Sequence, residues 1–214
     1  MAFFRKKALE YGVGLTSSQL DLFLSYLDEL WEWNQRINLT GLSARKKVIT
    51  DLFLDSLIPA SYLPRSGLFL DVGSGAGFPG IPLKIISPRL ITHLLEANSK
   101  KVSFLRQIIR LLKLRSIEVI KGRIEESGDR LCPDGYNVIT ARALAPLHQT
   151  IKWCAPFLRP EGFLVTFLGR GAEEDLEENR KIIEQNRLSP HTIIPYFLPG
   201  KGMKRSIIIF KRKK

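Results

Sequence analysis

Several features are scarce in this chain of 214 residues, and each scarcity excludes a class of protein. The two cysteines, Cys132 and Cys154, are too few for a disulfide framework and cannot form a zinc site by themselves. No apolar run approaches the roughly 20 residues that are needed to span a bilayer. The first residues, Met1-Ala-Phe-Phe-Arg-Lys-Lys, lack the apolar core of a signal peptide. We therefore expect a cytoplasmic protein that makes no membrane contact.

Acidic residues are also in short supply. Lys and Arg number 33, whereas Asp and Glu number 21, so the formal net charge is +12. The last fifteen positions hold no acid and seven basic residues, which are Lys201, Lys204, Arg205, Lys211, Arg212, Lys213 and Lys214. Such a surface attracts polyanions, because neutralising phosphates releases counterions. Charge alone slightly favours a nucleic-acid partner over a surface that serves only solubility.

A content of 44% hydrophobic and 25% charged residues is that of a folded globular protein. Residues 1–65 have helical patterns. Thr16 and Gln19 have the spacing of a capping box, and the helix that follows is expected to reach about Asn38. The three-and-four spacing of its apolar residues predicts a buried stripe of Leu20, Phe23, Leu24, Leu27, Leu30 and Trp31.

The pattern changes after Gly67. Short β-rich runs alternate with helical stretches, the runs being 68–72, 91–95, 117–120, 137–140 and 163–167. This alternation predicts a parallel sheet with right-handed crossovers, and two later strands around a glycine-containing loop predict an antiparallel hairpin. The fold predicted is α/β: the Rossmann-like, seven-stranded sheet of class I methyltransferases, preceded by N-terminal helices. We expect residues 1–65 to pack as a helical extension on a methyltransferase domain of residues 66–214, forming one compact unit.

A glycine-rich loop follows the first predicted strand. Gly73, Gly75 and Gly77 behind Asp71 match the G-x-G-x-G form that is typical of S-adenosylmethionine sites, but the segment from Gly75 to Gly80 also matches the dinucleotide fingerprint G-x-G-x-x-G. A pyrophosphate needs free N–H groups at the start of the next helix, and two prolines, Pro79 and Pro82, each remove one. S-adenosylmethionine carries no phosphate, so the prolines favour it as the cofactor.

Two further segments are expected beside the cofactor. Glu96 ends the second predicted strand, 23 residues beyond Gly73, where an acid accepts hydrogen bonds from ribose hydroxyls in this fold class. The loop after the third strand usually borders the adenine. There Ile124 is expected to lie against the base, with a backbone amide beside Glu125 at its edge. A simple strand-to-helix turn explains this second segment almost equally well.

The end of the fourth strand restricts the possible classes of methyl acceptor, because it lacks two known catalytic arrangements. Its end, Ala141-Arg142-Ala143, carries no Asn/Asp-Pro-Pro-aromatic clamp for an amine, and neither cysteine is placed for covalent attack on cytosine. A ring nitrogen such as guanine N7 has a free lone pair at neutral pH and needs no general base. Arg142 is the candidate catalytic residue, either for the cofactor or for the base, since arginine reads the N7 and O6 acceptors well. A salt-bridged structural arginine is the alternative.

A metal site is not expected. The three histidines, His93, His148 and His191, are scattered, and none pairs with a cysteine at ligand spacing. We predict that the reaction uses S-adenosylmethionine without a metal.

A set of segments resembles one known family over nearly the whole chain. They are Asn38-Leu-Thr-Gly41, Phe53-Leu-Asp-Ser-Leu57, Asp71 to Pro82, Glu96 to Leu105, Gly122-Arg-Ile-Glu125 and Thr140-Ala-Arg-Ala143. The chain is similar to the bacterial small-subunit rRNA guanine-N7 methyltransferases, historically called glucose-inhibited division protein B. The resemblance implies methyl transfer from S-adenosylmethionine to N7 of guanine 527 in 16S rRNA. It also implies cofactor contacts at Gly73, Phe78, Ile124, Glu125 and Arg142.

Partners and alternatives follow from this resemblance and the charge. Asn38, Lys204 and Arg205 are predicted to bind RNA, in the small subunit or its free 16S rRNA, and the chain is expected to be a monomer. Three places depart from the family pattern, which has His where this chain has Leu52, Asp where it has Asn137, and often Lys after the fifth strand, where this chain has Leu168-Gly-Arg170. Two other functions stay open: an NAD(P)-dependent oxidoreductase, and a non-catalytic RNA-binding protein with a methyltransferase fold.

Overall fold

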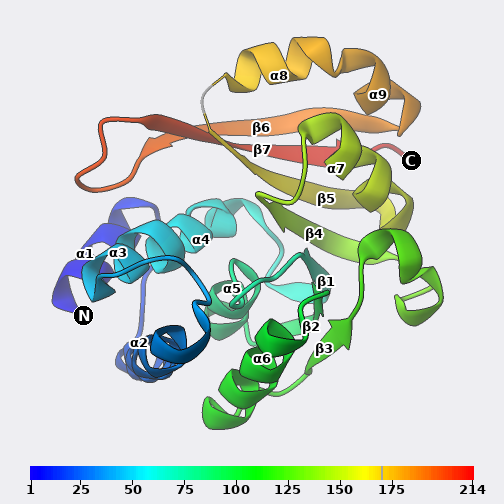
Figure 1. Cartoon of the computed structure of the whole chain (residues 1–214). Helices are drawn as coiled ribbons and strands as arrows, with labels where there is room; N and C mark the ends of the chain where they lie inside the picture. The colour runs from blue at the N-terminus through cyan, green and yellow to red at the C-terminus, as the bar shows by residue number, and fades with distance from the viewer. Residues whose placement is uncertain (170) are drawn as a thin grey trace.

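The computed structural model describes residues 1–169 and 171–214. Its centre is a seven-stranded sheet with the order β3-β2-β1-β4-β5-β7-β6 (Figure 1). β1 to β5 are parallel, whereas β7 pairs antiparallel with both β5 and β6. The predicted fold class is confirmed. The strands are β1 (Ser66–Val72), β2 (Arg89–Glu96), β3 (Ile117–Lys121), β4 (Tyr136–Arg142), β5 (Leu158–Leu168), β6 (Leu188–Phe197) and β7 (Lys204–Arg212).

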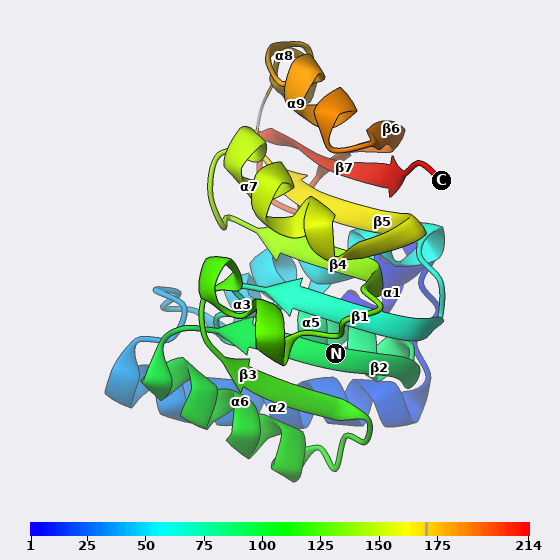
Figure 2. The same ribbon diagram turned by 90° about the vertical axis from the view of Figure 1, so that its right-hand side faces the viewer.

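Helices cover both faces of the sheet (Figure 2). Side chains alternate along each strand, so Phe69 joins the core beneath one helical layer and Leu70 joins the core beneath the other. The first layer holds α1 (Ala2–Glu10), α2 (Ser17–Ile37), α3 (Arg45–Val48), the π-helical turn η1 (Ile49–Leu54), α4 (Asp55–Leu57), η2 (Ile58–Tyr62), α5 (Gly80–Ile86) and α6 (Ser99–Leu111). The second layer holds η3 (Ile124–Glu126), η4 (Gly128–Arg130), α7 (Leu147–Cys154), η5 (Ala155–Phe157), α8 (Ala172–Glu178) and α9 (Arg180–Gln185).

The start of α2 is fixed locally. Gln19 N donates a hydrogen bond to Thr16 Oγ1 over 3.2 Å, and Thr16 N donates one to Gln19 Oε1 over 3.0 Å. The predicted capping box is therefore confirmed, and it satisfies two of the amides that a helix start leaves without partners. The helix ends at Ile37, and the left-handed conformation of the next residue, Asn38, stops it.

The predicted buried stripe of α2 was wrong at one position. Leu24 is 42% exposed, and Tyr26 is fully buried in its place. The observed stripe is Phe23, Tyr26, Leu27 and Leu30, which keeps the spacing i, i+3, i+4, i+7 and leaves Leu24 about 100° away around the helix. The predicted members at the margins, Leu20 and Trp31, are half-buried.

The N-terminal helices share a core with the sheet. Phe4, Phe23 and Phe53 contact one another, with ring centroids 5.0 to 5.9 Å apart, and belong to the same buried cluster as Phe69 and Ile81. The predicted boundary after residue 65 coincides with the start of β1 at Ser66. Within the described residues, no helix has the length and apolar character needed to cross a membrane.

Candidate active site

A cleft of about 600 Å³ lies at the carboxyl ends of β1 and β4. This is the edge where ligands bind in open α/β sheets. Its lining comes from the glycine loop after β1, the segment from the end of α2 to α4, the first turn of α6, the ends of β4 and β5, and the hairpin of β6 and β7. Its principal lining residues are Leu39, Thr40, Leu42, Asp51, Leu52, Asp55, Gly73, Ser74, Gly75, Ala76, Phe78, Lys101, Arg142, Tyr196, Met203 and Arg205. The volume falls in the range of small-molecule sites.

The near half of the glycine loop, residues 73–75, is held by backbone hydrogen bonds. Gly73 N and Ser74 N both donate to the Leu95 carbonyl, over 2.9 and 3.1 Å, which ties the loop to the end of β2. Gly73 and Gly75 have φ values of +67° and +60°, a region that glycine adopts without strain. A Cβ at Gly75 would meet nothing nearer than the Gly73 carbonyl oxygen at 3.9 Å. The loop therefore presents open backbone to the cleft.

Glu96 braces this open half. Its Oε2 accepts a hydrogen bond from Gly75 N over 2.8 Å, and its Oε1 accepts one from Asn98 N over 2.7 Å. The residue is only 8% exposed. Each carboxylate oxygen keeps a second lone pair, so the side chain retains acceptor capacity for ribose hydroxyls. Glu96 thus lies beside the glycine loop, but it is not among the described residues that line the cleft, and its contact with ribose stays a prediction.

The far half of the loop, residues 77–80, is packed against protein and leaves no open space. A Cβ at Gly77, where φ is +96°, would lie 2.5 Å from the Tyr26 hydroxyl oxygen and 2.6 Å from Ile81 Cδ1. A Cβ at Gly80 would lie 2.7 Å from Asp71 Oδ2. We expected Gly77 to contact the cofactor. In the structure the absence of a side chain at Gly77 makes room for Tyr26 and Ile81, and Gly77 is not among the described residues that line the cleft. Its contact with the cofactor stays a prediction.

The start of α5 offers no free amide for a pyrophosphate. Gly80 N donates to Asp71 Oδ2, Ile81 N to the Gly77 carbonyl and Leu83 N to the Pro79 carbonyl, while Pro82 has no N–H. Each of the first four positions of the helix is thus satisfied internally or lacks a donor. The structure supports the inference from the two prolines, and it fits a nucleoside cofactor without phosphate better than a dinucleotide.

Asp71 is a buried strut behind the loop. It is fully buried, and its carboxylate accepts hydrogen bonds from Thr140 Oγ1 over 2.7 Å and from Gly80 N over 3.0 Å. Burial raises the pKa of this carboxyl to about 6, although the hydrogen bonds oppose the shift. Asp71 therefore joins β1, β4 and α5 and makes no contribution to the surface of the cleft.

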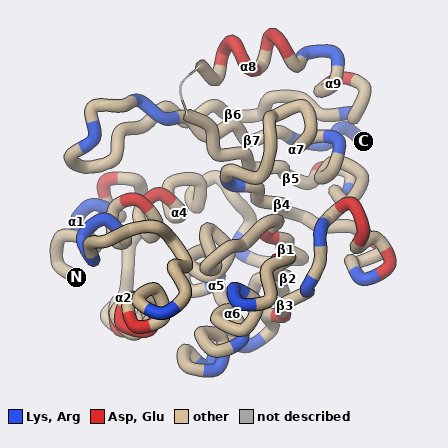
Figure 3. The backbone as a smooth tube through the Cα atoms, viewed as in Figure 1, with Lys and Arg blue, Asp and Glu red and all other residues tan. Residues whose placement is uncertain are grey.

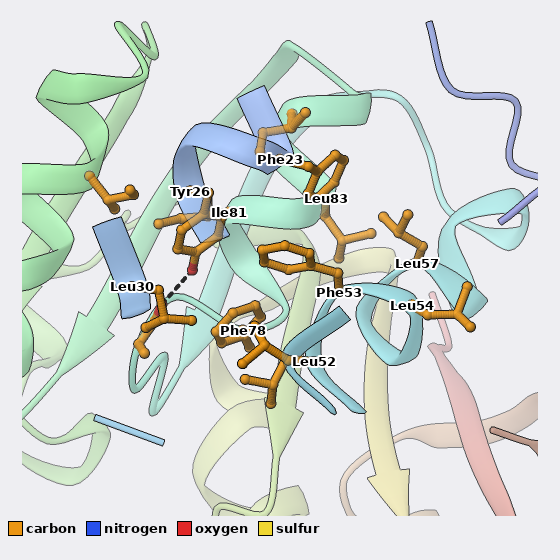
Figure 4. Close-up of a cluster of buried hydrophobic side chains, with 14 of the residues drawn as sticks. Phe23, Tyr26, Leu30, Leu52, Phe53, Leu54, Leu57, Phe78, Ile81 and Leu83 are labelled. Atoms are coloured by element: carbon orange, nitrogen blue, oxygen red, sulfur yellow. Dashed lines mark hydrogen bonds between the residues drawn. The ribbon is translucent and has the colours of Figure 1, made fainter. Parts of the chain in front are cut away.

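Phe78 and Arg142 meet at the floor of the cleft. Phe78 is 3% exposed, and the guanidinium carbon of Arg142 lies 5.5 Å from the centre of its ring. This is the geometry of a cation–π contact. Phe78 also stacks on Tyr26, with centroids 5.4 Å apart and the planes inclined by only 7°. Figure 4 shows Tyr26, Phe53 and Phe78 together in this buried cluster.

Asp55 joins three functional side chains that the sequence did not connect. Its buried carboxylate accepts a hydrogen bond from the Tyr196 hydroxyl over 2.7 Å and pairs with Arg205 Nη1 at 3.2 Å and Arg142 Nη1 at 3.4 Å. Burial, and then the nearby Asp55 charge, raise the pKa of Tyr196 well above its usual value. The predicted Arg142 and Arg205 are brought together here, and both line the cleft.

Asp55 and Tyr196 were missed as functional residues. Asp55 stands in the segment Phe53-Leu-Asp-Ser-Leu57, and a carboxylate within an apolar helical run is a signal of a buried partner. Tyr196 carried no such signal, since it occupies an ordinary strand position. Leu52, where the family has His, is 9% exposed and lines the cleft beside Asp51.

The two residues predicted beside the adenine lie outside this cleft. Ile124 is 3% exposed and packs in the second core, and the exposed Glu125 follows it in η3. Neither is among the described residues that line the cleft. Their roles as cofactor contacts stay predictions.

The predicted RNA-binding residues are separated. Asn38 is exposed at the end of α2, where its Oδ1 accepts a hydrogen bond from Gly41 N over 3.0 Å. Arg205 faces the cleft, but Lys204 points to the other face of the hairpin, beside Glu173 and Glu174. The hairpin also carries the basic residues 211–214 to the opposite edge of the sheet, because β7 runs antiparallel to β5.

Cysteine and metal chemistry gain no support. Cys154 is fully buried, and burial raises the pKa of its thiol far above the usual value. Asn137 lies at the start of β4, away from the cleft, and its Oδ1 accepts a hydrogen bond from Leu68 N over 2.9 Å. In the part of the chain that the structure describes, no three His, Cys, Asp or Glu side chains are placed to hold a metal ion.

The sheet order, the open glycine loop and the acid at the end of β2 define a class I, S-adenosylmethionine-dependent methyltransferase. Solved structures with this fold include M. jannaschii TYW2 in complex with AdoMet, with a TM-score of 0.61, 17% identity and 74% of each chain covered. Another is the O-methyltransferase from Bacillus cereus in complex with SAH, with a TM-score of 0.60 and 18% identity over 88% of this chain and 91% of that one.

Sequence comparison identifies the family. The model of the family "rRNA small subunit methyltransferase G" matches residues 19–203. The ribosomal RNA small subunit methyltransferase G of Acetivibrio thermocellus is 36% identical over 204 residues, which cover 94% of this chain and 84% of that protein. The protein of the same name from Bacillus licheniformis is 33% identical over 205 residues, covering 94% and 86%. The chain belongs to this family, as the resemblance of its motifs predicted.

Proposed function

We propose that this chain transfers a methyl group from S-adenosylmethionine to N7 of a guanine in 16S rRNA, at the position that the family resemblance identifies as guanine 527. The observation that carries the proposal is the continuity of the open glycine loop with a cleft that contains two arginines. The loop fits a cofactor that presses on bare backbone, and the arginines fit an acceptor rich in hydrogen-bond acceptors.

The residues of the chain act by positioning. When bound, S-adenosylmethionine supplies an electrophilic methyl group. Gly73 and Gly75 provide the backbone surface for it, Glu96 accepts from its ribose, and Phe78 lies against it. The N7 lone pair is free at neutral pH, so no residue has to remove a proton. Holding two reactants in line contributes on the order of 7–11 kcal/mol to such a displacement.

The arginine pair gives the cleft a preference for an acceptor rich in hydrogen-bond acceptors. Two guanidinium groups share one carboxylate, Asp55, so one positive charge remains uncompensated among these three groups. In our proposal Arg142 donates to guanine O6 and leaves the N7 lone pair free to attack. Asp55 fixes the direction of Arg142, because a guanidinium with a fixed partner loses less side-chain freedom on binding.

The distribution of charge suggests where the RNA approaches. Figure 3 shows basic residues on α3 and on the hairpin of β6 and β7, whereas α8 is acidic. Lys46 and Lys47 are exposed on α3, which joins the cleft residues Leu42 and Asp51. We place the small-subunit rRNA on this side, with Asn38 and Arg205 among its contacts and Lys204 at the edge. The protein acts there as a cytoplasmic monomer.

The central experiment supplies labelled S-adenosylmethionine to the protein with small ribosomal subunits, or with naked 16S rRNA, and maps the labelled nucleotide. We expect one N7-methylated guanine. Binding of RNA without transfer of label would favour a non-catalytic RNA-binding protein. Calorimetry that shows tight binding of NAD and none of S-adenosylmethionine would favour the oxidoreductase and overturn the proposal.

The RNA path has its own test. Each phosphate contact on a single strand contributes about 0.7 to the slope of log affinity against log salt concentration. The double variant Lys46→Gln/Lys47→Gln is therefore expected to lower that slope by about 1.4. Lys213→Gln/Lys214→Gln is the matched control, since it removes the same charge at the opposite edge. Equal slopes for the two variants would contradict the proposed path.

A further inference from the structure

Tyr26 connects a helix outside the sheet to the cofactor loop. It lies on α2, is 0% exposed, and donates its hydroxyl hydrogen to the carbonyl of Ala76 in the middle of the glycine loop. In Figure 4 a dashed line leaves the Tyr26 hydroxyl. Burial, and then the charge of Asp71, raise the pKa of this phenol well above its usual value, so it stays a donor. The hydrogen bond from Tyr26 satisfies the buried Ala76 carbonyl. Without this donor, the carbonyl would be buried without a partner, which costs its desolvation free energy.

The ring of Tyr26 supports the same loop from below. It stacks on Phe78, the aromatic residue at the floor of the cleft, and lies 5.2 Å from Phe53. Arg142 in turn lies over the Phe78 ring. Contact between the helix and the cleft therefore passes through one chain of packed side chains, Tyr26 to Phe78 to Arg142.

Gly77 shows that the loop is built around this tyrosine. The oxygen of Tyr26 occupies the place where a Cβ at Gly77 would lie. Three glycines with positive φ, Gly73, Gly75 and Gly77, make the isolated loop costly to order, because glycine loses the most conformational freedom on folding. Hydrogen bonds to Leu95 and Glu96 hold the loop on the side of β2, and Tyr26 holds it on the side of α2.

We propose that Tyr26 is a positioning residue, which holds the glycine loop and Phe78 in the shape that binds S-adenosylmethionine. The inference rests on the proposed function and deepens it. It assigns to the N-terminal helices a role in cofactor binding, in addition to their role in the core. Tyr26 itself is not among the described residues that line the cleft, so it acts through Ala76 and Phe78.

The test replaces Tyr26 by phenylalanine, which keeps the stacked ring and removes only the hydroxyl. We expect the Kd of S-adenosylmethionine, measured by calorimetry, to rise about tenfold, as for the loss of one buried hydrogen bond. With saturating cofactor kcat should change less than twofold, so that the loss appears in the KM for S-adenosylmethionine. Tyr26→Leu removes the ring as well and should raise the Kd further.

Phe23→Leu provides the matched control. Phe23 is equally buried one turn earlier on α2, but its ring contacts are with Phe4 and Phe53, not with the loop. It should lower the melting temperature and leave the Kd unchanged. The inference is overturned if Tyr26→Phe lowers only the melting temperature, or if both variants change the Kd in proportion to stability. Failure of the wild-type protein to bind the cofactor would instead count against the proposed function.

Discussion

The two halves of the glycine loop use the same residue type for opposite reasons. Gly75 leaves space above bare backbone, where a ligand fits, and Glu96 braces it from behind. Gly77 and Gly80 lack side chains because Tyr26, Ile81 and Asp71 already fill the space. The comparison shows that the number of glycines in such a motif does not give the number of residues that contact a ligand. Part of the motif leaves backbone open to the cleft, and part allows the helices to pack closely enough for the open part to hold its shape.

The largest effect is expected on the packed half. Gly77→Ala places a methyl group against Tyr26 and Ile81 and forces alanine into a left-handed conformation. Overpacking costs about 1–3 kcal/mol and the conformation about 1–2 kcal/mol, so the free energy of unfolding should fall by about 4 kcal/mol. Urea denaturation measures it. A variant of wild-type stability that had lost only cofactor affinity would place Gly77 with the open half after all.

The packed half also predicts a pH dependence. The pKa of Asp71 is about 6 in the folded protein, against the usual value of 3.8 for an aspartate side chain. The folded state thus holds a proton that the unfolded state releases between these values, so the free energy of unfolding falls as pH rises from about 4 to 6. About two pKa units correspond to about 3 kcal/mol. Denaturation at several pH values should show this decline in the wild type and not in Asp71→Asn, so the difference between the two curves isolates the contribution of Asp71.

The open half should respond in affinity. Gly75→Ala meets no protein atom within contact distance except the Gly73 carbonyl, so its stability cost is only the conformational one, about 1–2 kcal/mol. The added methyl group occupies space that the cofactor needs. We expect the Kd of S-adenosylmethionine to rise about 30-fold, or about 2 kcal/mol. Calorimetry beside urea denaturation separates the two effects, and an unchanged Kd would remove the distinction between the halves.

Much of the fold could be predicted because its signals are local. The capping box at Thr16, the alternation of strands and helices after Gly67 and the glycine-containing hairpin loop each depend on residues close in sequence. The error at Leu24 and Tyr26 had a different origin. Both positions are compatible with a helical stripe, and only the position of the neighbouring loop and Phe53 selects the buried one.

The candidate site was predictable in part. Gly73, Gly75, Glu96, Phe78 and Arg142 could be identified because motif and strand order place them at one edge of the sheet. The partners of Arg142 could not, since Asp55 and Tyr196 stand 87 and 54 residues away from it in sequence, and only the tertiary fold brings them together. The charge pattern treated Lys204 and Arg205 alike, but neighbouring residues on a strand face opposite sides, and of the two only Arg205 lines the cleft. RNA binding by Lys204 stays a prediction.

The amino-acid sequence by itself determined the class of fold, the methyltransferase family and the nature of the cofactor. These depend on backbone periodicity and on glycines and prolines, whose conformational limits act within a few residues. The tertiary structure alone decided which glycines are open and which are packed, which arginines share Asp55, and which basic residues lie near the cleft. These are contacts between distant segments, and they form only where close packing brings a particular pair of side chains into reach.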